Sequence, residues 1–536
     1  MRVLLLLTTI LCCNSFLWAQ SFLNNSYLSG SIETNSQYYL DNNKADILAP
    51  NDRFANNSYV NLFYQHKNIS AGIQFEGYNP ALQGYPRGYD GNKIVRRFVN
   101  FSNEKLSINV GHFYEQFGNG LVLRTFEERS LGLDNCLDGV GIKIQPTKKL
   151  NLKFVWGKPR FFMDASPGTV RGGDAEWTLT EKTTEKGLVL VQVGGSIVNR
   201  FMNYFGATSN FPESVTSLAG RFNVQYQNLY AAGEIVAKSK ESNFGNDYIK
   251  KKGNIFYLKT GWQHPANVMG VQVQFRRLEN ADSKANFNTA EAVASINYTP
   301  ALTRQHTFVL ANIYPHAVQT IGEIGGMADF FVRFKKNTPL GGKYGTKLDL
   351  NFSLYHSLDS TRVSTEEGFK TNHYFGFGKT KLFRDFNASV DKRWTSHYKT
   401  IISVVSLFYN RSILQGGPYS SVQANLIATD HYIKLKKSQQ LRLNAEHMWT
   451  KTDEKNWLAL LAEWSFSNGL SLFASDMINY QSKKINYYNV GFAISKGGQR
   501  LQMSAGQQRA GLICVGGICR FVPSYSGFSV NYFVNL

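Results

Sequence analysis

The chain ends in Gly527-Phe528-Ser529-Val530-Asn531-Tyr532-Phe533-Val534-Asn535-Leu536, where apolar or aromatic residues recur at every second position from Phe528 to Leu536. Successive side chains of a β-strand point to opposite faces, so these residues would share one face and an Asn-rich row the other. We expect a β-strand that closes the fold. Such alternation also occurs in half-buried strands of soluble antiparallel sheets, so this stretch alone leaves soluble and membrane sheets open.

The composition of the chain is uniform from end to end. A chain of 536 residues would ordinarily form several soluble domains. No Pro- or Ser-rich linker divides it, and Asn, Tyr, Phe and Ser recur at even density, with 46 Gly but only 13 Pro. We therefore expect a single architecture over residues 20–536.

Residues 1–19 have the pattern of a secretory signal peptide. The apolar run 3–11 follows Arg2, and a small residue, Ala19, ends the segment. Cys12 allows the alternative of a lipid anchor, although that signal needs a small residue before the cysteine and a leucine stands there. The sequence thus predicts an exported protein.

No other stretch resembles a membrane-spanning helix, which needs roughly 18–20 apolar residues in a row. The best rival, 401–408, is too short and lies between Lys399 and Arg411. An exported chain of this kind is free in the periplasm, secreted, or a membrane β-barrel.

The mature chain is a series of strand-like segments in which apolar residues alternate with Asn, Gln, Asp, Lys and Ser, as the wall of a water-filled barrel requires. Short turns, such as 147–150, 226–229 and 467–470, alternate with longer links, such as 81–92, 164–186, 238–253 and 359–371. We predict an all-β fold, a single large transmembrane antiparallel β-barrel of about 22–26 strands. Besides the last ten residues, the expected strands lie at 59–64, 69–76, 106–113, 150–156, 188–193, 219–226, 230–237, 256–262, 271–275, 307–313, 329–334, 348–354, 401–408, 441–444, 457–462, 470–473, 490–492 and 501–505.

The chain is strongly basic. It has 58 Lys and Arg against 38 Asp and Glu, a formal charge of +20, and removal of Arg2 with the signal peptide leaves +19. Such a surface can contact lipopolysaccharide phosphates and membrane lipid or draw anions into a lumen, and the simpler alternative is that basic residues fill loops and lumen walls. Nucleic acid is not an expected partner, because no binding motif is present.

Cys514 and Cys519 flank Gly516-Gly517 near the C-terminus. In an oxidising compartment this spacing suits a disulfide at the tip of a hairpin. A metal site would need two further ligands, and no His or Cys lies nearby in the sequence. We expect the disulfide, no metal, and a free buried thiol at Cys136.

The segment 112–135 is more polar than a strand requires. Arg124, Glu127, Glu128, Arg129 and Asp134 can pair among themselves, and charges inside a barrel persist mainly when paired. We expect residues 117–135 to fold into the lumen as a constriction, and a solvated outer loop is the alternative.

Two further stretches carry residues of the kinds found in functional sites. The histidines of 298–316 have no acidic partner or nucleophile nearby in the sequence, so catalysis is poorly supported there. The Gly-rich 339–346 lacks the Gly-Lys-Ser/Thr ending of a phosphate loop and is expected to be a turn. The sequence predicts no cofactor.

Several motifs resemble those of Bacteroidota-type outer-membrane β-barrel proteins catalogued only as a domain of unknown function. The resemblance spans nearly the whole mature chain and implies an outer-membrane barrel, with no activity attached. The C-terminal segment 509–523 is also similar to the last hairpin of some TonB-dependent receptors. The motifs that carry the family resemblance are 117–121, 124–129, 133–135, 300–306 and 340–346.

We therefore expect a non-enzymatic protein of the outer membrane. It would be channel-like or porin-like, or an accessory subunit of an envelope transport or secretion assembly with other outer-membrane or lipoprotein partners. The alternative is a barrel hydrolase, which would need a Ser/His/Asp or paired-Asp site on the barrel wall, and no such cluster is legible. A TonB-dependent receptor is disfavoured because residues 20–26 leave no room for a plug domain before the first strands.

Overall fold

The computed structural model describes residues 26–536, apart from 186, 204–210, 365–367 and 437. The predicted signal peptide, residues 1–19, lies outside the described residues. Among the residues that are described, no helix is both long and apolar enough to cross a membrane.

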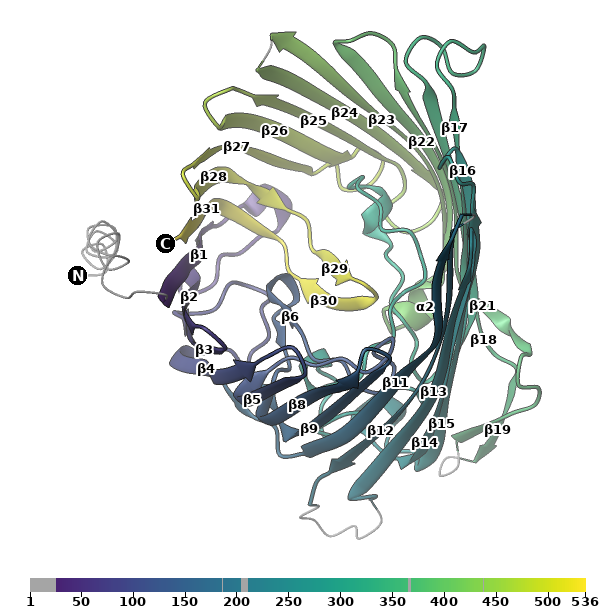
Figure 1. Ribbon diagram of the computed structural model, residues 1–536. Helices are drawn as coiled ribbons and strands as arrows, with labels where there is room; N and C mark the ends of the chain where they lie inside the picture. The colour runs from purple at the N-terminus through teal and green to yellow at the C-terminus, as the bar shows by residue number, and fades with distance from the viewer. Residues whose placement is uncertain (1–25, 186, 204–210, 365–367, 437) are drawn as a thin grey trace.

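The molecule is one closed antiparallel β-barrel (Figure 1). Its main sheet has 25 strands, of which the two-residue β10 (Asp164–Ala165) pairs only with β9, and the other 24 form the wall. This confirms the predicted fold class and strand number. The wall strands are β1 (Ser26–Leu40), β2 (Phe54–His66), β3 (Ile69–Tyr78), β4 (Gly91–Ser102), β5 (Leu106–Phe113), β8 (Leu137–Thr147), β9 (Leu150–Phe161), β11 (Thr169–Thr184), β12 (Gly187–Phe201), β13 (Ser214–Tyr226), β14 (Leu229–Glu241), β15 (Lys251–Gln263), β16 (Met269–Glu279), β17 (Gly322–Phe334), β18 (Thr346–Leu358), β21 (Phe377–Arg393), β22 (Tyr398–Tyr409), β23 (Val422–Lys436), β24 (Gln439–Thr450), β25 (Trp457–Ser465), β26 (Leu470–Asn479), β27 (Asn486–Lys496), β28 (Gln499–Gln508) and β31 (Tyr525–Asn535).

The C-terminal strand β31 closes the barrel, as its alternation predicted. It pairs with β28 on one side and with β1 on the other, where Phe528 faces Tyr38 and Asn535 faces Ser31. The first and last strands therefore lie side by side in Figure 1. Closure leaves no unpaired sheet edge, which is the condition for a β-structure to cross a lipid bilayer.

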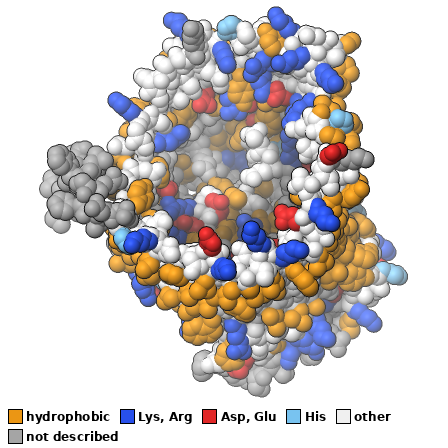
Figure 2. All heavy atoms as spheres, in the orientation of Figure 1, with side chains coloured by type: hydrophobic (Ala, Val, Ile, Leu, Met, Phe, Trp, Pro, Cys, Tyr) orange, Lys and Arg blue, Asp and Glu red, His pale blue; other side chains and the backbone are white. Residues whose placement is uncertain are grey.

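The outer face of the wall is apolar. Large hydrophobic side chains such as Val110, Leu218, Ile235 and Val490 are more than half exposed. Figure 2 shows the hydrophobic side chains gathered on the outer wall, with Lys, Arg, Asp and Glu around the opening. Exposed apolar surface on this scale is unfavourable in water and favourable against lipid.

The two ends of the barrel differ in the length of their links. One end, the short-turn end, has links of a few residues, except for residues 335–345, and both ends of the described chain lie there. The other end, the long-loop end, has the long segments. Its links are 41–53, 79–90, 114–136, 162–168, 202–213, 242–250, 280–321, 359–376, 410–421, 451–456, 480–485 and 509–524.

Two sequence-based assignments were wrong. Residues 307–313, expected as a strand, belong to the 280–321 link and contain the 3-10 turn η6 (Ala311–Ile313). Their apolar residues alternate because they pack on the inner wall, not because they pair in a sheet. Residues 164–186, expected as a link, mostly form β11, whose many polar residues resembled a loop.

Three segments of the long-loop end fold into the lumen, as Figure 1 shows for the last of them. The first inner loop is residues 114–136 and contains β6 (Glu127–Glu128), η3 (Arg129–Leu131) and β7 (Leu133–Asp134). The second inner loop is residues 280–321. The third segment is the hairpin of β29 (Gly511–Val515) and β30 (Ile518–Val522), a two-stranded sheet of its own. We call these three segments together the plug.

Candidate functional site: the plug and the cavity beside it

The first inner loop reaches the inner face of the wall at β14. Asn119 donates hydrogen bonds from its backbone N and from Nδ2 to Glu234 Oε2 on β14, at 2.9 and 2.7 Å. Phe117 and Leu123 are fully buried against inward-facing side chains of the wall, such as Val155 and Val236. Segment 117–135 thus lies inside the barrel, as the sequence hypothesis proposed.

The predicted charged cluster is only partly joined together. Glu127 Oε1 accepts from Arg129 Nε at 2.7 Å, and Arg129 also pairs with Glu33 of β1 at 2.5 Å. Glu128 instead accepts a hydrogen bond from the backbone N of Ser130 at the start of η3. Of the five predicted residues, Glu127 and Arg129 therefore pair with each other, and Glu128 binds within its own turn.

Arg124 and Asp134 find partners elsewhere. The guanidinium of Arg124 lies 4.3 Å from the ring centre of Tyr298 in the second inner loop, a cation–π contact. Asp134 Oδ2 accepts from Arg160 of β9 at 2.6 Å. Sequence reasoning missed Arg160 and its second partner Glu76, because neither lies near the loop in the chain.

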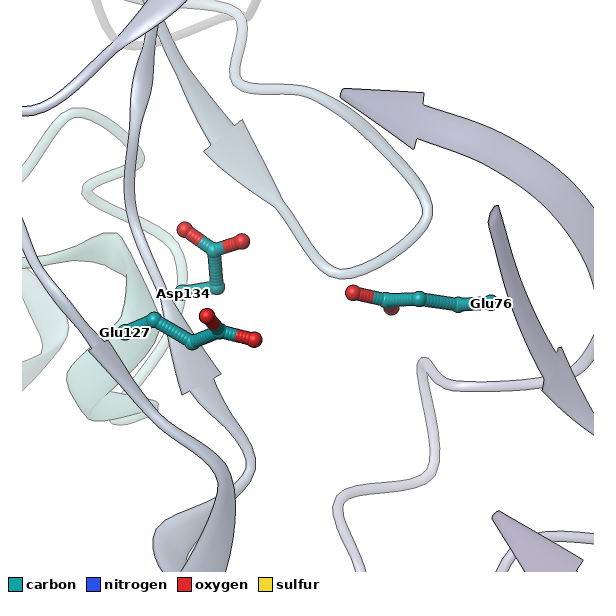
Figure 3. A group of neighbouring side chains, drawn as sticks. All are labelled: Glu76, Glu127 and Asp134. Carbon is teal, nitrogen blue, oxygen red and sulfur yellow. The ribbon is translucent and has the colours of Figure 1, made fainter. Parts of the chain in front are cut away.

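Three carboxylates, Glu76, Glu127 and Asp134, converge at this point (Figure 3). Such a group can suggest a metal ion, but Arg160 already lies against two of them, donating to Glu76 at 2.5 Å as well as to Asp134. Gln74 Nε2 donates to Glu76 at 2.8 Å. We interpret the group as a buried ion-pair latch that holds the first inner loop on the wall.

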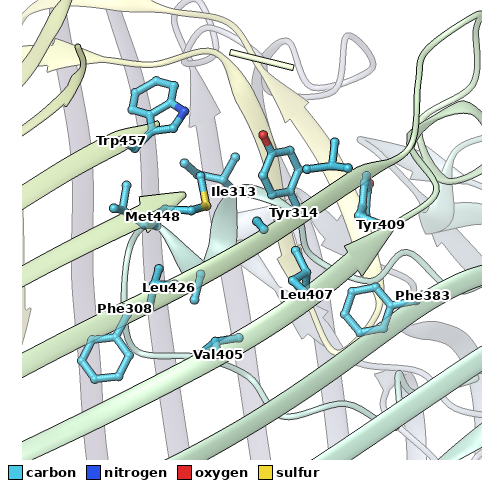
Figure 4. Close-up of a cluster of buried hydrophobic side chains, with 14 of the residues drawn as sticks. Phe308, Ile313, Tyr314, Phe383, Val405, Leu407, Tyr409, Leu426, Met448 and Trp457 are labelled. Carbon is cyan, nitrogen blue, oxygen red and sulfur yellow. The ribbon is translucent and has the colours of Figure 1, made fainter. Parts of the chain in front are cut away.

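The second inner loop covers a different part of the wall, from β18 to β25. Figure 4 shows Phe308, Ile313 and Tyr314 of the loop packed against wall residues that include Leu426 and Met448. Burial of these apolar side chains against the inner wall stabilises the loop inside the lumen. It explains why this long link does not remain in solvent.

Polar contacts fix the same loop to the wall. Glu446 on β24 accepts from the backbone N of Val309 and Leu310, at 3.0 and 2.8 Å. His306 Nε2 lies 2.6 Å from Asp385 Oδ2 on β21. Both carboxylates are buried and inward-facing, so they satisfy backbone and imidazole groups that would otherwise be unpaired inside the protein.

The hairpin carries the predicted disulfide, Cys514–Cys519. Its tip, Gly516-Gly517, has positive φ at both residues, a conformation that glycine adopts without strain. The tip docks on the second inner loop, where Gly516 O accepts from Ala301 N and from the hydroxyl of Tyr298, at 2.9 and 2.8 Å. The predicted free thiol, Cys136, is buried and unbridged, and burial raises the pKa of that thiol.

The other side of the hairpin contacts the first inner loop. Arg520 donates from Nε to Ser130 O at 2.7 Å and from Nη1 to Gly84 O, in the link 79–90, at 2.6 Å. The hairpin thus joins both inner loops at the centre of the lumen.

A cavity of about 510 Å³ remains between the hairpin, the second inner loop and the inner faces of β24 to β28. Its size is within the range of small-ligand sites. Arg442, which lines it, is held by a bidentate pair with Asp430 at 2.9 and 2.8 Å. Arg509, which lines it too, lies over the ring of Trp457 and has no carboxylate partner among the described residues. Other polar lining residues are Asn444, Ser475, Asn489, Ser504 and Gln508.

The fold supplies acidic partners for the histidines that lacked them in the sequence. Besides His306, His316 Nε2 lies 3.1 Å from Glu323 Oε2, and its ring stacks on Tyr355. Within the part of the chain that the structure describes, no hydroxyl or thiol is hydrogen-bonded to either ring, so a nucleophile activated by these histidines is not in place. These two pairs attach the second inner loop to the barrel wall.

Comparison with known proteins returned one family and several barrels. A model described as "Family of unknown function (DUF6029)" matches residues 1–536. No curated protein matches the sequence. Among solved structures, the P pilus usher (PapC) translocation pore is similar with a TM-score of 0.42 and 9% identity, over 95% of this chain and 99% of that one. The siderophore receptor PirA from Pseudomonas aeruginosa is similar with the same TM-score and identity, over 95% of this chain and 80% of that one. Likeness this low says nothing about what this protein carries or binds.

Proposed function

The chain belongs to DUF6029, a family of unknown function, and from its own geometry we propose that it is an outer-membrane channel closed by its own loops. In this proposal the plug blocks the lumen at rest, and displacement of the hairpin opens a path for a small polar solute along the cavity beside β24 to β28. The protein performs no chemistry on the solute.

The membrane location is supported by the wall. The barrel has no free edge, and exposed aromatic side chains gather near both ends, as they do at the two interfaces of membrane barrels. At the short-turn end these include Tyr226, Trp394 and Trp464, and at the long-loop end Phe54, Phe201 and Phe377. Short turns are typical of the periplasmic end, so the plug enters from outside the cell.

The observation that carries the channel proposal is the attachment of the hairpin. Its strands pair with each other and with no wall strand, so the hairpin can move without breaking the barrel. Its tip is held by a few hydrogen bonds to Ala301, Tyr298 and Val318. A segment held in this way can move between docked and undocked positions at modest cost.

The test is removal of the hairpin. Replacing residues 511–522 by a short Gly-Ser link should raise single-channel conductance in a planar bilayer several-fold, because the central contact between the inner loops is lost. The matched control shortens the other hairpin of the long-loop end, β19 (Ser360–Ser364) and β20 (Gly368–Thr371), which lies outside the lumen in Figure 1 and should leave conductance unchanged. A folded hairpin-deleted barrel with wild-type conductance would contradict the proposal.

Co-purification from native membranes distinguishes a channel that acts alone from an accessory subunit of a larger assembly. A channel that acts alone should be recovered as this chain only. Stable recovery of a second envelope protein would assign the plug to a larger assembly.

A further inference from the structure

The short-turn end of the barrel carries many exposed basic residues and few exposed acids. Within four residues of the short links, the described residues include fourteen exposed Lys and Arg but only three exposed acids, Glu104, Glu181 and Glu185. We call these basic residues the basic rim. Representatives from different turns are Lys67, Lys148, Lys335, Arg393, Lys434 and Lys496.

The basic rim is not ion-paired among the described residues. Among the described residues, none of its members forms an ion pair, whereas several arginines inside the lumen do, as Arg160 does with Glu76 and Arg276 with Glu323. The long-loop end carries both signs: in the link 41–53, Asp41 pairs with Arg53 at 2.5 Å. The positive electrostatic field of the rim can therefore attract an external anion.

The position of the basic rim indicates what that anion is. Its members are spread over turns around the barrel, whereas a folded partner protein would meet only one sector. The same end carries exposed aromatic side chains such as Tyr226 and Trp394, which are 56% and 51% exposed. Aromatic residues in this position lie at the level of lipid headgroups, so cations just beyond them reach the lipid phosphates.

We propose that the basic rim binds anionic phospholipid headgroups of the leaflet that surrounds the short-turn end. This inference rests on the proposed membrane location and not on the proposed solute path. It concerns only the short-turn end, so contact with lipopolysaccharide stays a separate prediction for the long-loop end.

The test measures lipid preference around the folded full-length barrel. The protein is inserted into phosphatidylcholine vesicles that contain brominated phosphatidylglycerol or brominated phosphatidylcholine, and quenching of tryptophan fluorescence is recorded. We expect stronger quenching by the anionic lipid, and loss of the difference at about 1 M salt, where the Debye length falls to about 3 Å.

Matched variants locate the effect. The quadruple variant Lys148→Gln, Lys149→Gln, Lys335→Gln, Lys336→Gln should lose roughly a third of the preference, because it removes four of the fourteen basic rim residues and each surface lysine adds to the attraction for anionic lipid. The control neutralises four exposed lysines of the long-loop end, Lys451, Lys455, Lys483 and Lys484, and should keep the preference.

The outcomes separate this inference from the proposal on which it rests. Equal quenching by both lipids in an inserted barrel would overturn the lipid site and leave the membrane location standing. The lipid site would also be overturned if the rim variant kept its preference for the anionic lipid but lost binding to peptidoglycan. Failure of the folded protein to enter vesicles would overturn the membrane location itself.

Discussion

Arg160 lies where the first inner loop meets the barrel wall. Its guanidinium is almost fully buried and pairs with Glu76 on β3 and Asp134 in the loop. Removing one partner from a buried ion pair leaves an uncompensated charge, which costs more than the pair contributes when intact. Stability at this point therefore depends on charge balance more than on the number of contacts.

We predict that Arg160→Met destabilises the barrel by about 3–5 kcal/mol, because Glu76 and Asp134 lose their counter-charge. The triple variant with Glu76→Gln and Asp134→Asn should recover most of that loss. The measurement is the midpoint of unfolding followed by gel mobility. The control Arg171→Met removes an exposed arginine of β11 and should change little. Equal effects of both single variants would argue against the latch.

Cys136 is expected to be inert in the folded protein. It is buried, and burial raises the pKa of its thiol, so the reactive thiolate is scarce. Iodoacetamide at pH 8 should label it only after unfolding. The control Ser482→Cys places a thiol on an exposed link and should be labelled in the folded state. Rapid labelling of Cys136 would show that the plug opens on its own.

At the scale of elements, the plug is three segments that touch at the hairpin tip. A Cβ atom added at Gly516 would lie 1.9 Å from the hydroxyl oxygen of Tyr298, so any larger residue there must displace one of them. The disulfide stiffens the hairpin, but so short a loop is stabilised by only about 2–3 kcal/mol. Docking and stiffness can therefore be altered separately.

We predict that Gly516→Val undocks the hairpin and increases the open time of the channel in planar bilayers. The matched control is Gly416→Val. Gly416 also has positive φ but has nothing within 4 Å of an added Cβ, so the control carries the backbone strain without the clash. Identical channel records for the two variants would mean that tip docking does not close the lumen.

We predict that the double variant Cys514→Ser, Cys519→Ser still folds and inserts, because the hairpin is not part of the wall. It should be cleaved faster within 511–522 by added protease than the wild type, since the unstapled hairpin opens more readily. If the unboiled variant no longer migrated on gels as the folded protein does, the disulfide would be needed for assembly.

At the scale of the whole molecule, an apolar outer wall encloses a polar lumen that the barrel closes with its own links. We predict that the mature protein fractionates with the outer membrane, resists carbonate and urea washes, and changes gel mobility on boiling. The physical reason is the continuous hydrogen-bonded wall, which has no edge from which to unzip. Release by a carbonate wash would contradict the membrane location.

The sequence by itself determined the wall. Alternation is a local property, so strands such as β31 and β18 and the Cys514–Cys519 hairpin could be predicted from a few neighbouring residues. The tertiary structure alone decided how the lumen is filled, because those contacts join residues far apart in the chain. Arg160 meets Asp134 and Glu76, and His306 meets Asp385, only in the folded barrel. Residues 307–313 had the alternation of a strand but became part of the plug. A period of two indicates only that one face of a segment is apolar. It does not indicate whether the segment pairs within the sheet or packs against the sheet.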